Sequence, residues 1–166
     1  KLDRAGKTVY AKNHNTGADE TYDYDMLVIA TGARPVKPPI PGIDLENIFT
    51  LRDPDNADRI KAAVATGNIK RACIIGGGAI GLEMAENLSL LGVRASVIDM
   101  APHILPGYDA DFADYAENML ADHGIPVFLN DSVVGFEGEG RVQKLRTEKR
   151  AIKTDMVIMS VGVRPN

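Results

Sequence analysis

The sequence has little of several features that define whole classes of protein. Its 166 residues include one cysteine and no tryptophan, and a single cysteine excludes an intrachain disulfide framework or a cysteine-based zinc cluster. No apolar run approaches the roughly 18 residues that a membrane-spanning helix needs, and no secretory signal peptide precedes the first strand pattern. We therefore expect no membrane association and no structural metal.

A net positive charge is also lacking, because 23 acidic residues outnumber 19 basic ones and the formal net charge at pH 7 is −4. Basic residues gather only near the C-terminus, where acidic residues stand beside them and no aromatic residues are interleaved, as is typical of a solvated hairpin rather than a nucleic-acid surface. We therefore expect no nucleic-acid partner. The basic residues of this cluster are Lys144, Arg146, Lys149, Arg150 and Lys153.

The most informative pattern is a glycine turn between a strand and a helix. The apolar run Ala72–Ile75 predicts a buried strand, and Gly76-x-Gly78-x-x-Gly81 leads directly into a helical pattern. In such a turn the first glycine permits the tight bend, the second lets a phosphate approach the backbone, and the third lets helix and strand pack closely. Amides at the helix N-terminus favour an anion, so the turn predicts a site for a dinucleotide pyrophosphate. The candidate phosphate-binding residues are Gly76, Gly77, Gly78, Ala79, Ile80 and Gly81.

An acidic residue ends the next predicted strand, Ala95–Asp99, at 23 positions after Gly76 (99 − 76). A carboxylate there can accept hydrogen bonds from both hydroxyls of an adenosine ribose. The charge of Asp99 would repel a 2′-phosphate, and the next four residues include no Arg or Lys, so NAD(H) is favoured over NADP(H). A P-loop is excluded because no Gly-Lys-Ser/Thr follows the glycines. A methyltransferase is compatible with the turn and the acid alone.

Strand and helix patterns alternate through the middle of the chain and predict an α/β fold. We expect a Rossmann-like parallel sheet with helices on both faces and an antiparallel β-meander, which the typical methyltransferase sheet lacks. A strand over 156–161 is expected to return to the sheet. The inward-facing stripes are expected to be Ile80, Met84, Leu88 and Leu91 in the helix Ala79–Leu91, and Phe112, Tyr115, Ala116 and Met119 in the helix Ala110–Asp122.

The first 36 residues differ from this pattern and predict a small antiparallel β segment. A strand is expected at Thr8–Ala11, a turn at 15–17, and a continuous apolar strand at Met26–Ala30. Four prolines between residues 35 and 41 predict an extended crossover. Both ends of the chain look cut, so we expect it to be part of a longer protein.

Four motifs in this order identify a family. They are LVIATGARP at 27–35, IIGGGAIGLEMAEN at 74–87, VID at 97–99 and VGVRPN at 161–166. The chain resembles the FAD-dependent pyridine nucleotide-disulphide oxidoreductases, and most of all the branch of coenzyme A-disulphide reductases and NADH oxidases. The resemblance covers nearly the whole chain. It implies that residues 1–36 close the first segment of a FAD domain, that 37–160 form the NAD(H)-binding domain, and that 161–166 begin the return to the FAD domain.

The resemblance also implies roles for single residues. Ala30, Thr31 and Gly32 match a segment that approaches the flavin, and Gly162 matches a backbone position lining the nicotinamide pocket. Glu83 matches a glutamate near the nicotinamide–flavin contact, although a carboxylate in the first turns of a helix can equally serve the helix dipole. Many relatives have a larger residue where Ala79 stands, and that residue shields the flavin until the nicotinamide displaces it. The resemblance therefore makes no prediction about such gating in this chain.

The family's FAD fingerprint and redox cysteine do not appear in this chain, so no catalytic residue is expected within it and the fragment alone should be inactive. Cys73 does not match the redox position and is expected to be a buried structural thiol. The resemblance implies a cytoplasmic homodimer that passes hydride from NADH to FAD, then to a disulphide, persulphide or oxygen acceptor. A ferredoxin- or rubredoxin-type reductase and a non-catalytic nucleotide-binding module remain as alternatives.

Overall fold

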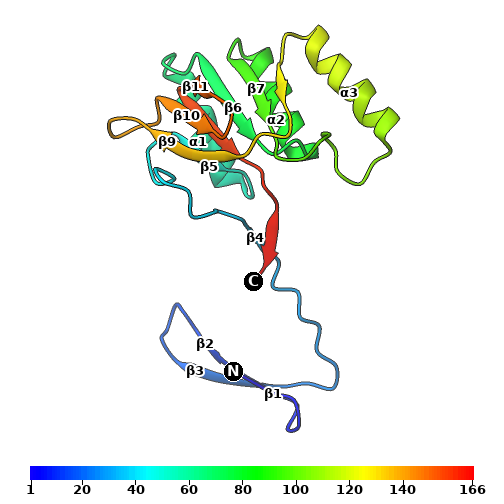
Figure 1. Ribbon diagram of the computed structural model, residues 1–166. Helices are drawn as coiled ribbons and strands as arrows, with labels where there is room; N and C mark the ends of the chain where they lie inside the picture. The colour runs from blue at the N-terminus through cyan, green and yellow to red at the C-terminus, as the bar shows by residue number, and fades with distance from the viewer. The chain divides into compact units, whose positions relative to one another are not determined.

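The computed structural model describes residues 1–166. The chain divides into two compact units, Lys1–Gly32 and Ala33–Asn166. Figure 1 shows the elements of both units in chain order by colour. Each unit is described separately below.

The first unit is a three-stranded antiparallel sheet. β1 (Leu2–Asp3), β2 (Thr8–Lys12) and β3 (Asp19–Asp23) pair in the order β1-β2-β3. The side chain of Asn13 closes the turn from β2 to β3, because its Oδ1 accepts hydrogen bonds from the amides of Asn15 and Thr16. Gly17, at φ 74°, completes the turn. The predicted first strand and turn are therefore confirmed.

The strand predicted at Met26–Ala30 is wrong. These residues have no regular secondary structure, and Met26 and Val28 are 91% and 85% exposed. An apolar run forms a strand only where other strands satisfy its backbone and cover its side chains. No strand of the first unit pairs with this run.

The second unit is built on a five-stranded parallel sheet in the order β5-β12-β6-β7-β8. β6 lies at its centre, and β12, the returning strand predicted from 156–161, lies between β5 and β6. A separate antiparallel pair joins β4 (Ala33–Pro35) to β13 (Val163–Pro165). The strands of the main sheet are β5 (Ile48–Thr50), β6 (Arg71–Ile75), β7 (Arg94–Ile98), β8 (Val127–Phe128) and β12 (Met156–Met159).

Three helices connect these strands: α1 (Pro54–Ala65), α2 (Ala79–Leu90) and α3 (Ala110–Asp122). The predicted start of α1 is confirmed, because Asp53 caps it through a 2.8 Å hydrogen bond from the Asn56 amide and Pro54 occupies the first turn. No helix of the chain is long and apolar enough to span a bilayer.

The prediction of helices on both faces of the sheet is wrong. Along β6, Ala72 and Ile74 face a core that contains side chains of all three helices, whereas Cys73 and Ile75 face a core that contains none. The second face is covered by the predicted antiparallel meander, which Figure 1 shows in yellow to orange-red. Side chains such as Phe136 and Leu145 bury that face as a helix would. The meander strands are β9 (Val133–Glu137), β10 (Lys144–Thr147) and β11 (Ala151–Lys153).

The two predicted inward stripes are also partly wrong. In α2 the buried residues are Gly81, Ala85 and Leu88, and in α3 only Ala113 is buried. Small residues let a helix axis approach the sheet closely, so they take the inward positions that larger side chains would block. Larger apolar residues that were expected to face inward are instead 46–63% exposed: Ile80, Leu91, Phe112, Tyr115 and Met119.

Candidate functional site

A cleft of about 610 Å³ lies where the carboxyl ends of β6, β7 and β12 meet. In open parallel sheets this is where ligands bind, at the point where the strand order changes direction. One wall comes from the glycine turn and the Asp99 loop, and the other from the segments that follow β8 and β12. The lining residues used below are Gly76, Gly78, Asp99, Asp131, Ser160 and Gly162.

Two of the three motif glycines are required by packing. Gly76 has φ 106°, and a β-carbon there would collide with the Ser160 carbonyl. A β-carbon on Gly81 would collide with the carbonyl of Gly76. The Ser160 hydroxyl lies 2.9 Å from the Ile75 carbonyl and 3.0 Å from that of Gly76, and donates to this pair of oxygens. The turn is therefore locked against the end of β12.

Gly78 differs from both, because no heavy atom lies within 4 Å of where its β-carbon would stand. It is the N-cap residue of α2, with φ −77° and ψ 174°, and no side chain caps this terminus. The first amides of a helix have no partners within the helix, and the helix dipole makes this end attractive to an anion. The space above Gly78 is thus open to a phosphate group.

The side chain of Asp99 is tied to the same turn. Its Oδ2 accepts a 2.6 Å hydrogen bond from the Gly77 amide, and its Oδ1 accepts a 2.8 Å hydrogen bond from the Ala101 amide. A carboxylate has about four acceptor positions, so each oxygen keeps one for a ligand. The carboxylate is therefore held in place and can still accept from two neighbouring hydroxyls.

The other predicted site residues are placed as follows. Gly162 lines the cleft. Ala79 and Glu83 line a different groove of about 380 Å³ between α2 and α3, and Ile80 is half exposed. Ala30, Thr31 and Gly32 belong to the first compact unit.

Sequence reasoning missed Ser160 and Asp131 as members of the site. Ser160 directly follows β12, and Asp131 stands three residues after β8. Since the carboxyl ends of parallel strands meet at one edge of the sheet, polar residues just after predicted strands were a usable signal.

The comparisons with known proteins agree with this geometry. The family model for pyridine nucleotide-disulphide oxidoreductases matches residues 1–166, the whole chain. The chain belongs to this family. Its relatives include NADH oxidases and CoA-dependent sulfur oxidoreductases.

An NADH oxidase of Enterococcus faecalis is 43% identical over 165 residues, covering 96% of this chain and 36% of that protein. The structure of a NAD-dependent persulfide reductase from A. fulgidus is 34% identical with a TM-score of 0.90, over 100% of this chain and 30% of that one. The structure of the water-forming NADH oxidase of Lactobacillus brevis bound to NADH is 35% identical with a TM-score of 0.87, over 99% of this chain and 36% of that one. This chain therefore spans about a third of the length of the relatives that it matches.

The cysteine of this family member is confirmed as a buried thiol. Cys73 is 1% exposed, and its Sγ lies 3.4 Å from the hydroxyl oxygen of Ser96. Burial raises the pKa of the Cys73 thiol, and the contact with Ser96 only partly offsets this. A buried, protonated thiol is a poor nucleophile, so Cys73 serves packing.

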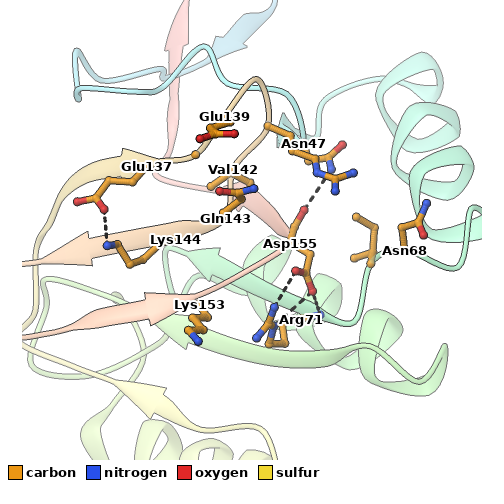
Figure 2. A pocket seen from close by; sticks show the side chains of 13 residues that line it. Asn47, Asn68, Arg71, Glu137, Glu139, Val142, Gln143, Lys144, Lys153 and Asp155 are labelled. Carbon is orange, nitrogen blue, oxygen red and sulfur yellow. Dashed lines mark hydrogen bonds and ion pairs between the residues drawn. The ribbon is translucent and has the colours of Figure 1, made fainter.

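A second hollow, of about 650 Å³, lies at the opposite end of the sheet (Figure 2). It is polar, and the glycine turn at residues 76–81 does not line it. Its central feature is the contact of Arg71 with Asp155, 2.9 Å between Nη2 and Oδ1. Asp155 Oδ2 also accepts from the amides of Lys70 and Arg71, and the Asp155 carbonyl accepts from the side chain of Asn47. This network joins the starts of β6 and β12, so we assign it a structural role.

The Asp155→Asn variant is expected to be less stable by about 1–2 kcal/mol at pH 7, because hydrogen bonds to a charged group are lost. Partial burial acts to raise the pKa of Asp155, but the hydrogen bonds from Arg71 and Lys70 lower it on balance. The stabilisation is therefore present above the unfolded-state pKa of about 3.9 and is lost as the pH falls below it.

Urea unfolding of both proteins between pH 7 and pH 3 measures this difference, which should shrink in acid. Glu139→Gln is the control, since Glu139 is an exposed residue of the same hollow (Figure 2) without an ion pair. A difference that stays constant down to pH 3 would contradict the assignment.

Proposed function

We propose that this chain is the NADH-binding part of a FAD-dependent oxidoreductase. The observation that carries the proposal is the open helix N-terminus at Gly78 with the anchored carboxylate of Asp99 beside it. Together they offer a pyrophosphate site and a ribose site in one cleft. Family membership and a similar solved structure bound to NADH support the proposal.

The residues present fit this cofactor. The amides at the start of α2 would hold the pyrophosphate, and Asp99 would accept from the adenosine ribose. Gly162 would border the nicotinamide end of the cleft, and a role for Glu83 at the nicotinamide–flavin contact is also proposed. When bound, NADH supplies the hydride and FAD receives it. The task of this chain is to bind and orient the nicotinamide.

We propose that Ala30, Thr31 and Gly32 approach the flavin, and that residues 1–36 and 161–166 belong to a FAD domain whose larger part is separate from this chain. The antiparallel pairing of β4 with β13 supports this division, because it joins the segments that enter and leave residues 37–160. The full-length protein is proposed to be a cytoplasmic homodimer.

The proposed acceptor is a small disulphide or persulphide, or oxygen. Support comes from relatives that are a CoA-dependent sulfur oxidoreductase and an NADH oxidase. Since Cys73 is buried within the sheet, it cannot pass electrons to such an acceptor. We therefore propose that this chain alone binds the nucleotide but does not catalyse electron transfer to an acceptor.

Calorimetric titration of the chain with NADH, NADPH and FAD tests the proposal. NADH is expected to bind, and at least about tenfold more tightly than NADPH, because the 2′-phosphate would approach the carboxylate of Asp99. If neither pyridine nucleotide binds, the proposal fails. Tighter binding of NADPH would refute the role of Asp99.

The Asp99→Asn variant is expected to bind NADH about tenfold more weakly and to lose most of its preference over NADPH. Removing the charge weakens hydrogen bonds from the ribose and removes repulsion of the 2′-phosphate. Asp122→Asn is the matched control, because Asp122 is an exposed carboxylate at the end of α3 and outside the cleft. An unchanged ratio of the two affinities in Asp99→Asn would count against the assignment.

A further inference from the structure

The main chain of Asp99 is held from both sides by the end of β8 and the segment that follows it. Its amide donates to the Phe128 carbonyl at 2.9 Å, and its carbonyl accepts from the Asp131 amide at 3.0 Å. The Asn130 amide likewise donates to the Ala101 carbonyl at 2.9 Å. The position of the candidate ribose carboxylate therefore depends on residues 128–131.

Arg150 touches the side chains of both residues that hold Asp99. It precedes β11, so it comes from the meander, about fifty positions along the chain from Asp99. Its guanidinium carbon lies 4.5 Å from the centre of the Phe128 ring, and its Nε lies 2.8 Å from Asp131 Oδ2. One arginine thus bridges two neighbours of Asp99.

The Asp131 side chain is fully buried, at 0% exposure, whereas that of Arg150 is 39% exposed. Asp131 Oδ1 accepts a 3.3 Å hydrogen bond from the Lys149 amide. Its Oδ2 has no well-directed hydrogen bond, because the N–H of Arg150 approaches closely but is not aimed at the oxygen. We treat the contact as a charge pair. A buried carboxylate without a cation is strongly unfavourable. The buried position of the Asp131 carboxylate therefore depends on the charge of Arg150.

We propose that Arg150 is a positioning residue for the ribose carboxylate, acting through Phe128 and Asp131. The inference rests on the proposed binding of NADH in this cleft. Arg150 does not line the cleft, and its role is to keep the segment 128–131, and with it Asp99, where the adenosine half of NADH is recognised. A residue of the meander, on one face of the sheet, thus affects nucleotide affinity in the cleft at the carboxyl ends of the strands.

The test measures the affinity of the full chain for NADH and for ADP-ribose, which contains the adenosine half but no nicotinamide. In Arg150→Met both ligands are expected to bind about five- to tenfold more weakly, by a similar factor. Arg150→Lys keeps the charge opposite Asp131 but loses the guanidinium that lies over the Phe128 ring, so it is expected to bind both ligands about two- to threefold more weakly than the wild type. Arg146→Met is the matched control, because Arg146 is an exposed arginine of the same hairpin that pairs with Glu137.

Equal NADH affinity of Arg150→Met and the wild type would overturn the inference. So would a loss for NADH without a loss for ADP-ribose, or an Arg150→Lys variant as weak as Arg150→Met. If Arg150→Met does not fold, the comparison of Arg150→Lys with Arg146→Met decides, since only the former should weaken binding at all. Failure of the wild type to bind NADH would instead remove the proposed function itself.

Discussion

Gly78→Val is expected to lower the affinity for NADH by about a hundredfold or more while the chain stays folded. The valine side chain would extend into the open space above the N-terminus of α2, which is the proposed pyrophosphate position. Two charge-assisted hydrogen bonds of about 1.5 kcal/mol each account for a loss of this size. The backbone at Gly78 has a negative φ, so any residue can adopt it.

Calorimetry measures the affinity, and circular dichroism checks the fold. Gly135→Ala is the control, because Gly135 also has space for a β-carbon, with the Pro41 carbonyl 3.9 Å away, but lies on β9 outside the cleft. It should bind NADH as the wild type does. A folded Gly78→Val protein that binds NADH normally would show that the glycine turn is not the pyrophosphate site.

Gly76→Ala is expected to destabilise the second unit by about 4 kcal/mol, a large part of the 5–15 kcal/mol that usually stabilises a domain. Two effects combine at this position. The φ of 106° disfavours any residue with a β-carbon, and that carbon would collide with the backbone of Ser160, which cannot rotate away. Relief would require β6 and β12 to separate at their carboxyl ends.

Gly107→Ala separates the two effects, because Gly107 has nearly the same φ, 110°, but no atom within 4 Å of its missing β-carbon. That variant should lose only about 1–2 kcal/mol, the cost of the backbone conformation. Urea unfolding followed by circular dichroism gives both values. Similar losses at the two positions would mean that the contact with Ser160 has little effect.

The turn and the first unit illustrate what local patterns can and cannot predict. Gly76, Gly81 and Asp99 were identifiable because their roles depend on spacing along one strand–turn–helix–strand unit. The strand at Met26–Ala30 was predicted from the same kind of apolar run and is absent. A strand needs partners elsewhere in space, and an apolar run does not show whether these are present.

The helix stripes were partly wrong for a related reason. Periodicity marks which residues are apolar, and it favoured Ile80 and Phe112 as inward residues. The distance between helix and sheet depends on how both surfaces pack. Here the small residues Gly81, Ala85 and Ala113 face inward, and of the predicted stripes only Leu88 is fully buried. The same holds for the second face of the sheet, which the sequence showed to be apolar without showing that a meander covers it.

The sequence by itself determined the alternating strands and helices, the glycine turn, the acid that follows it and the family. Each of these depends on residues that lie close together along the chain. Only the tertiary structure decided that Ser160 locks the turn, that Gly78 alone of the three motif glycines is open, and that Arg150 lies beside the residues that hold Asp99. The Ser160 contacts join residues 84 and 85 positions apart, and the Arg150 contacts join residues 19 and 22 positions apart. The first contacts arise where parallel strands align their ends, and the second where the antiparallel meander packs on the sheet, so both are properties of the assembled fold and not of any one segment.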